Sequence, residues 1–218
     1  MKLPISDRLL ACAAFVRPGD RIADVGCDHG YLSIHLLQEN IAASAICSDV
    51  RPQPLQSAIR NAEKYGLRDK MEFYLSDGVQ NIPKDFDTLV CAGMGADTMV
   101  SILTAAPWLK DGKYSLILQC QSKTPMLRQY LSDEGYAIAR ELVLRDGRFL
   151  YTVMEVIFAP EEPRLTPAQC YLPTFLQGDE ADAYRKWVVG GLKIATQHQN
   201  DAEKEEILQE LEDTYDHR

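Results

Sequence analysis

Residues 24–33 read DVGCDHGYLS and follow the apolar lead-in RIA at 21–23. A strand that ends in an acid and a glycine, with a second glycine opening a helical pattern, is typical of the turn that holds a nucleotide cofactor in α/β proteins. A common cofactor turn has a glycine where Asp28 stands here. The stretch therefore raises the question of which ligand tolerates an acid at that place.

Strand-like and helical patterns alternate around this turn. Apolar runs predict strands at 21–25, 44–50, 70–76, 86–93 and 114–120, and helical patterns cover 30–40, 52–66, 95–105 and 123–134. Such alternation predicts a mostly parallel sheet with right-handed crossovers. Residues 136–159 are two long strand patterns around Asp146-Gly147, which is a hairpin signal. We therefore expect an α/β fold, a Rossmann-like sheet ending in an antiparallel hairpin, as in class I methyltransferases.

Four segments that can hold a ligand follow four consecutive strands, at the edge where open α/β sheets bind ligands. They are Asp24-x-Gly26-x-x-x-Gly30, Asp49, Asp77-Gly78 and Gly93-Met94-Gly95. The glycines of the first permit a tight turn and a close approach of the next helix. The aspartate of the second can accept both hydroxyls of a ribose. The third suits an adenine edge, and the fourth lets the backbone border the reactive end of the ligand. Together they predict an adenosine-containing cofactor.

The acid in the turn distinguishes between cofactors. A dinucleotide places its pyrophosphate at this turn, and Asp28 puts a negative charge beside that anion. S-adenosylmethionine has no phosphate, and its ammonium and sulfonium are cationic, so Asp24 and Asp28 attract it. We therefore expect S-adenosyl-L-methionine as the cofactor, with His29 ordering the turn or lining the methionine moiety. The sequence predicts no metal site.

The charge is concentrated near the C-terminus. The chain has a net charge of −9; residues 1–160 carry 17 Lys and Arg against 19 Asp and Glu, and residues 161–218 carry 6 against 13. The larger part can therefore still present a basic face to a nucleic acid.

The proline-rich stretch 159–167 predicts a linker, and helical patterns over 179–218 break near Asn200-Asp201, where Asn or Asp can cap a second helix. We expect residues 1–160 to form the cofactor-binding domain, and 161–218 a linker and a C-terminal helical hairpin with a thin apolar seam of Leu208, Leu211 and Tyr215.

Six cysteines contain no C-x-x-C pair and mostly lie in apolar runs, which predicts buried free thiols in a reducing, cytoplasmic compartment. No apolar run is long enough for a membrane span, and the start of the chain lacks a secretory signal pattern. The oligomeric state stays open between a monomer and a weak dimer.

Seven segments follow the order of motifs in one known family: ISDRL (5–9), DVGCDHGYLS (24–33), SDV with PLQSA (48–58), SDGV (76–79), AGMGA (92–96), LILQC (116–120) and GRFLYTVMEV (147–156). Over about residues 3–160 the chain resembles the bacterial tRNA (adenine(22)-N1)-methyltransferases. The resemblance implies a class I methyltransferase domain, a helical C-terminal domain, and methyl transfer from S-adenosylmethionine to N1 of an adenine in tRNA. The chain departs from the family at Ser33 and Cys120, where proline is usual, and at Ala96, where glycine is usual.

Substrate contacts are expected near the acceptor. Arg8, beside the first motif, can meet a phosphate or Asp24, Tyr31 can stack on a base, and Gln119 borders the acceptor. Four further arginines can contact tRNA, although each has acidic neighbours: Arg128, Arg140, Arg145 and Arg148.

The segment AGMGA at 92–96 lacks the Asp/Asn-Pro-Pro-aromatic group that holds an exocyclic amine. Adenine N1 has an in-plane lone pair and needs no prior deprotonation, so proximity can supply most of the catalysis. Asp28 is the expected catalytic group, because a carboxylate stabilises the cationic methylated ring; His29 or a backbone carbonyl near Gly93 is the alternative. Two other functions stay open, since a fold does not determine function: a methyltransferase for a small molecule or protein, and a non-catalytic RNA-binding module.

Overall fold

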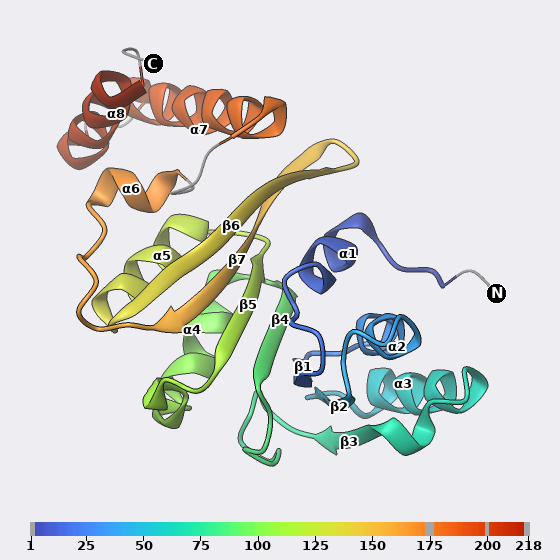
Figure 1. The fold of residues 1–218 in the computed structure, drawn as a ribbon. Coiled ribbons are helices and arrows are strands. Elements are labelled where there is room, and N and C mark those ends of the chain that lie inside the picture. Colours follow the sequence, from blue (N-terminus) through green and yellow to red (C-terminus); the bar gives the residue numbers. More distant parts are fainter. Residues whose placement is uncertain (1–2, 173–176, 199–200, 216–218) are drawn as a thin grey trace.

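The computed structural model describes residues 3–172, 177–198 and 201–215. A seven-stranded sheet with the order β3-β2-β1-β4-β5-β7-β6 forms its centre (Figure 1). The strands are β1 (Arg21–Val25), β2 (Ser44–Asp49), β3 (Met71–Leu75), β4 (Thr88–Met94), β5 (Ser115–Cys120), β6 (Tyr136–Asp146) and β7 (Phe149–Phe158). The first five are parallel, and β7 runs antiparallel to both β5 and β6. The expected Rossmann-like sheet with a terminal antiparallel hairpin is confirmed.

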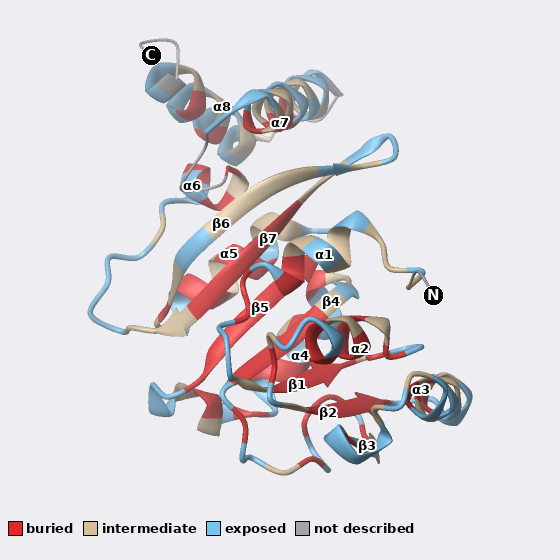
Figure 2. Ribbon diagram, turned by 45° about the vertical axis from the view of Figure 1, so that its right-hand side comes forward, coloured by how far each residue is buried: buried red, intermediate tan, exposed pale blue. Residues whose placement is uncertain are grey.

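Helices cover both faces of this sheet. One face packs against α1 (Asp7–Ala13), α2 (Tyr31–Gln38) and α3 (Pro52–Lys64), and the other packs against α4 (Ala96–Thr104) and α5 (Thr124–Asp133). Neighbouring strand residues alternate between the two cores, as Ile22 and Ala23 do on β1. The central strands are therefore buried on both sides (Figure 2), which explains why they read as continuous apolar runs.

The helix ends follow the sequence signals. Ser6 caps α1 by accepting a hydrogen bond from the Leu9 amide at 3.4 Å. Pro52 lies at the first position of α3, and Gly66 follows that helix with a φ of +70°. Two short 3₁₀ helices, η1 (Arg68–Lys70) and η2 (Pro107–Asp111), precede β3 and β5.

The β6–β7 hairpin turns one residue later than the sequence signal suggested. Asp146 pairs with Phe149 across the ladder, so Gly147 and Arg148 form the two-residue turn. Only the glycine of these two has a positive φ, +61°, as in a type II′ turn. Asp146 therefore stays in the strand, and its side chain is available to bind Arg8.

The C-terminal region has one helix more than expected. The stretch after β7 contains the short α6 (Pro167–Tyr171), which a capping box between Thr166 and Gln169 starts. The expected helical hairpin is present as α7 (Asp179–His198) and α8 (Ala202–Tyr215), and Asp201 accepts a hydrogen bond from the Lys204 amide. Leu208 and Leu211 pack as expected, whereas the Tyr215 side chain lies outside the described residues.

These three helices share a core with the β6–β7 hairpin. Val143 and Leu150 of the hairpin pack against a cluster of buried residues from α6, α7 and α8. Figure 1 shows α7 and α8 side by side at the hairpin end of the sheet. The C-terminal helices are thus packed on the sheet.

Arg128 was a candidate tRNA contact, and the structure contradicts that expectation. Its side chain is fully buried, pairs with Glu141 of β6 and donates a hydrogen bond to the Leu172 carbonyl at 2.8 Å. It joins α5, the hairpin and the chain after α6. Arg140 and Arg145 keep partly exposed side chains that pair with Glu155 and Glu180.

All six cysteines lie in the described part of the chain, and each is buried with a free thiol, as expected. Burial raises the pKa of the Cys12 and Cys91 thiols to about 12. Among the described helices, none combines the length and the hydropathy that crossing a bilayer requires.

The Arg128–Glu141 pair should be a major contribution to stability. We expect Arg128→Met to lower the free energy of unfolding by about 3–5 kcal/mol, because it leaves the Glu141 carboxylate buried without the guanidinium. Replacing both residues, with Glu141→Leu as the second change, should recover most of the loss. Arg145→Met is the matched control and should cost at most about 1 kcal/mol, since its ion pair is exposed. Urea unfolding of the four proteins measures this, and equal losses in the two single variants would contradict it.

Candidate active site

A cavity of about 550 Å³ opens at the carboxyl ends of the parallel strands, where the strand order reverses between β1 and β4. We call it the strand-end cavity. It brings together eight of the residues expected to bind the cofactor: Asp24, Gly26, Asp28, Asp49, Asp77, Gly78, Gly93 and Met94. The two others, His29 and Gly30, lie next to it without lining it.

The β1–α2 turn forms one wall and is tied to β2. The amides of Gly26 and Cys27 both donate to the Ser48 carbonyl, at 2.8 and 2.9 Å. Gly26 has a φ of +71°, and Asp28 adopts the left-handed region at +48°, which is uncommon for a residue with a side chain. Gly30 serves the packing of the helices, because a Cβ there would lie 3.1 Å from the Ala58 Cβ of α3.

Asp49 ends β2 with its carboxylate already oriented. The residue is 4% exposed, and its two oxygens accept hydrogen bonds from the Asp28 amide at 3.3 Å and the Arg51 amide at 2.9 Å. Backbone donors of this kind hold a carboxylate in one orientation, and Arg51 Nε also lies 3.8 Å from the oxygen that accepts from the Arg51 amide. Asp49 can therefore present a fixed pair of acceptors to a vicinal diol.

Asp24 is an acid buried at the floor of the strand-end cavity. Burial raises its pKa to about 6, and hydrogen bonds from Ser33 oppose that rise. The Ser33 hydroxyl donates to the Asp24 carboxylate at 2.7 Å, and the Cys47 thiol contacts the same hydroxyl at 3.3 Å. Ser33 thus supplies a donor that a proline at this position would lack.

The end of β4 is irregular where it borders the cavity. A β-bulge falls between Ala92 and Met94, and Gly93 within it has a φ of +78°. The Gly93 amide donates to the Gln119 side-chain oxygen at 3.0 Å. Gln119 is fully buried and does not reach the cavity, so it supports the bulge instead of bordering the acceptor.

The sequence analysis missed Gln121, Arg51 and Thr98, which all line the strand-end cavity. Gln121 follows the last residue of β5, so its place after a predicted strand was an available signal. Arg51, the N-cap of α3, also follows the end of a predicted strand, whereas Thr98 lies within the first turn of α4 and carries no such signal.

Arg8 reaches the cavity from α1, although not toward Asp24. Its Nε lies 2.5 Å from an Asp146 oxygen, its guanidinium lies 5.2 Å from the centre of the Tyr151 ring, and Nη1 donates to Gln119 at 3.4 Å. Its charge is therefore partly offset by the hairpin. The cavity has four aspartates and only two arginines, Arg8 and Arg51, in its described lining, so its net charge is negative.

Asp28, His29 and Tyr31 form the rim. The Asp28 side chain is 60% exposed, and His29 Nε2 lies 3.7 Å from one of its oxygens. The His29 and Tyr31 rings stack at 5.7 Å. Asp28 therefore faces both the cavity and solvent. In the described residues, no group of three or more His, Cys, Asp or Glu side chains is arranged to hold a metal ion.

Comparisons with known proteins agree with this geometry. A family model described as a methyltransferase domain matches residues 5–154. The curated tRNA (adenine(22)-N1)-methyltransferase of Bacillus subtilis is 33% identical over 154 residues, which cover 70% of this chain and 65% of that protein. The chain therefore matches less than two thirds of that relative's own length.

Two solved structures are similar over nearly the whole chain. The crystal structure of the Bacillus subtilis m1A22 tRNA methyltransferase superimposes with a TM-score of 0.80 at 26% identity, covering 99% of this chain and 97% of that one. A candidate tRNA (m1A22) methyltransferase of Streptococcus pneumoniae, solved with S-adenosyl-L-methionine, has a TM-score of 0.83 at 29% identity, covering 95% and 99%. Since the family model spans more than half of the sequence, the chain belongs to the methyltransferase-domain family.

Proposed function

We propose that this protein transfers a methyl group from S-adenosylmethionine to N1 of an adenine in tRNA, at position 22, in the cytoplasm. The observation that carries the proposal is the acidic strand-end cavity, in which a buried Asp49 is oriented for a ribose and Asp24 and Asp28 favour a cation. The relatives named as tRNA (adenine(22)-N1)-methyltransferases supply the acceptor.

The donor set of the cavity fits S-adenosylmethionine better than a dinucleotide. Asp49 would hold the ribose, and the Asp24 carboxylate would lie near the ammonium end. Asp77 and Gly78 would border the adenine, and the bulge at Gly93 and Met94 would border the methyl group. Bound S-adenosylmethionine supplies an electrophilic methyl group on a sulfonium. A pyrophosphate at the same turn would be repelled by Asp28.

The acceptor needs little acid–base help. The N1 lone pair of adenine would form the new carbon–nitrogen bond as the methyl–sulfur bond breaks and S-adenosylhomocysteine leaves, and the ring would stay cationic until a proton leaves N6. The extruded base must be held in line with the methyl–sulfur bond. Asp28, at the rim, would stabilise the positive ring, and His29 or a carbonyl near Gly93 is the alternative group.

We also propose a division of labour within the chain. The described residues that line the strand-end cavity all lie between Ser6 and Gln121, which supports a cofactor-binding role for residues 1–160. Residues 161–218 would position the tRNA.

Asp49→Ala should weaken binding of S-adenosylmethionine about 10- to 100-fold. The change removes charge-assisted hydrogen bonds of about 1.5–3 kcal/mol. Asp85→Ala is the matched control, because Asp85 is 89% exposed and pairs with Arg21 away from the cavity. Isothermal calorimetry checks both variants. Binding of NAD by the wild-type protein, with no heat from S-adenosylmethionine, would overturn the cofactor assignment.

Binding of S-adenosylmethionine should weaken below a pH of about 6, as Asp24 is protonated. The free energy of unfolding changes with pH in the opposite direction. Because the pKa of Asp24 is raised by folding, the folded state favours the protonated acid, and the folded protein loses stability as the pH rises through about 6. Ionised Asp24 therefore costs up to about 3 kcal/mol at neutral pH.

Asp24→Asn should accordingly raise the free energy of unfolding at pH 7, lose this advantage at pH 4, and bind the cofactor weakly at both. Urea unfolding and calorimetry at the two pH values check this. A wild-type affinity that stays constant from pH 7 to pH 5 would show that Asp24 does not meet the cation.

Asp28→Asn should lower the single-turnover rate of methyl transfer more than it lowers cofactor affinity. The assay uses labelled S-adenosylmethionine and unmodified bulk tRNA. Equal losses in rate and in affinity would show that Asp28 is only a cofactor ligand.

Mapping the methylated nucleotide in the product identifies the methylated atom. A methyl group on N6 of adenine or on guanine would refute the N1 assignment. Labelling of protein or small metabolites alone would favour a methyltransferase with a different substrate. Binding of tRNA without transfer of any label would favour a non-catalytic RNA-binding module.

A further inference from the structure

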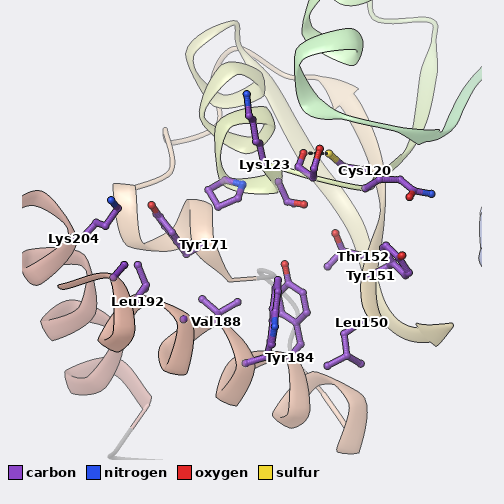
Figure 3. A pocket seen from close by; sticks show the side chains of 17 residues that line it. Cys120, Lys123, Leu150, Tyr151, Thr152, Tyr171, Tyr184, Val188, Leu192 and Lys204 are labelled. Carbon is purple, nitrogen blue, oxygen red and sulfur yellow. Dashed lines mark hydrogen bonds between the residues drawn. The ribbon is translucent and has the colours of Figure 1, made fainter. Parts of the chain in front are cut away.

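A second cavity, of about 380 Å³, lies between the C-terminal helices and the β6–β7 hairpin (Figure 3). We call it the aromatic cavity, because Tyr151, Tyr171, Tyr184 and Trp187 all line it. Gln121 lines both this cavity and the strand-end cavity. The two cavities are therefore neighbours on either side of one side chain.

Aromatic side chains of this cavity come from separate parts of the fold. Figure 3 shows Tyr171 of α6, Tyr184 of α7 and Thr152 of β7 facing one space. Tyr184 is 4% exposed, whereas Trp187, one turn further along α7, is 64% exposed, and their rings lie 5.6 Å apart. The cavity thus combines a buried aromatic floor with an exposed indole at its edge.

Thr152 lines the cavity and carries a buried polar atom without a partner among the described residues. The residue is 1% exposed, and its hydroxyl has no hydrogen-bond partner within the described part of the chain. A buried hydroxyl without a partner costs free energy that a bound ligand can recover. The cavity therefore suits a ligand with both a flat apolar face and a hydrogen-bonding edge.

The described lining of the cavity is compatible with an anionic ligand, because it contains no acidic side chain. Residues 161–218 carry 13 acidic against 6 basic residues, yet of the described residues that line the cavity none is acidic and two are lysines. Lys123 and Lys204 also pair with Asp97 and Asp201, which offsets part of their charge. Residues 161–218 are acidic as a whole, but the described side chains that they place in this cavity are aromatic, apolar or basic.

We propose that the aromatic cavity binds an unpaired nucleobase of the tRNA substrate, next to the adenine that is methylated. The base would stack on Trp187 and bond the Thr152 hydroxyl, and its phosphates would lie near Lys123 and Lys204. The inference rests on the proposed tRNA substrate. Extruding the target base unstacks its neighbours, and aromatic side chains can take up that stacking. The shared Gln121 lets one nucleic-acid strand reach both cavities.

Tryptophan fluorescence tests the stacking directly. The chain has two tryptophans, and Trp108 lies in η2 before the start of β5, where it packs against Phe86 and Tyr114. Unmodified tRNA should quench the fluorescence of the wild type and of Trp108→Phe, whereas Trp187→Phe should lose the quenching. Quenching that persists in Trp187→Phe would overturn the proposal.

Affinity and kinetics test the same contact without fluorescence. Trp187→Ala should weaken tRNA binding about 5- to 100-fold, and Trp187→Phe should restore most of that loss, since a ring is again available for stacking. Thr152→Val, which keeps the shape and removes the hydroxyl, should raise the KM for tRNA several-fold with kcat and S-adenosylmethionine affinity unchanged. Thr214→Val on the exposed side of α8 is the matched control.

The outcomes separate this proposal from the methyltransferase assignment. If the wild type methylates tRNA while Trp187→Ala and Thr152→Val keep its KM, only the cavity proposal fails. If no methyl reaches tRNA, the assignment fails, and the fluorescence titration still decides the cavity. A dimer in sedimentation that Trp187→Ala dissociates would show that a second copy of the chain occupies the cavity instead.

Discussion

The right-handed crossover connection is the constraint on which the rest of the structure depends. From β1 the chain moves to β2 and β3 in one direction, so α2 and α3 lie on one face of the sheet. From β4 it moves to β5 in the opposite direction, so α4 lies on the other face. The loops after β1 and β4 therefore diverge, and the strand-end cavity forms between them.

A chain of side chains links this cavity to the far end of the sheet. Asp146, beside the hairpin turn, binds Arg8; Arg8 contacts Gln119; and Gln119 accepts a hydrogen bond from the Gly93 amide in the bulge. The antiparallel hairpin thus does more than close the sheet, because it helps to set the backbone of the bulge that borders the strand-end cavity. Arg128 makes a separate connection, since it joins α5 and the hairpin to the chain before α7.

Features that depend on local pattern could be predicted from the sequence. The carboxyl ends of parallel strands lie at one edge of the sheet, so residues that follow them, such as Asp49 and Gly93, lie close together. Their proximity could therefore be predicted once the strands had been assigned. The burial of individual side chains and their hydrogen-bond partners could not be predicted in this way. Arg128 and Gln119 read as polar residues near an acceptor, but both are buried by partners distant in sequence: Leu172 for the arginine, and Arg8 and Gly93 for the glutamine. The short α6 was missed because its capping box lies within a proline-rich stretch.

The buried thiols have a practical consequence for chemical labelling. Reaction with maleimides or disulfide reagents requires a thiolate. Burial raises the pKa of Cys12 and Cys91, and the pKa is also raised for Cys27 and Cys120, the two cysteines that line the cavities. A single cysteine added on an exposed position, such as one on the outer side of α8, would be the preferred target. A fluorophore or spin label could then be attached selectively to the C-terminal helices without first removing the native cysteines.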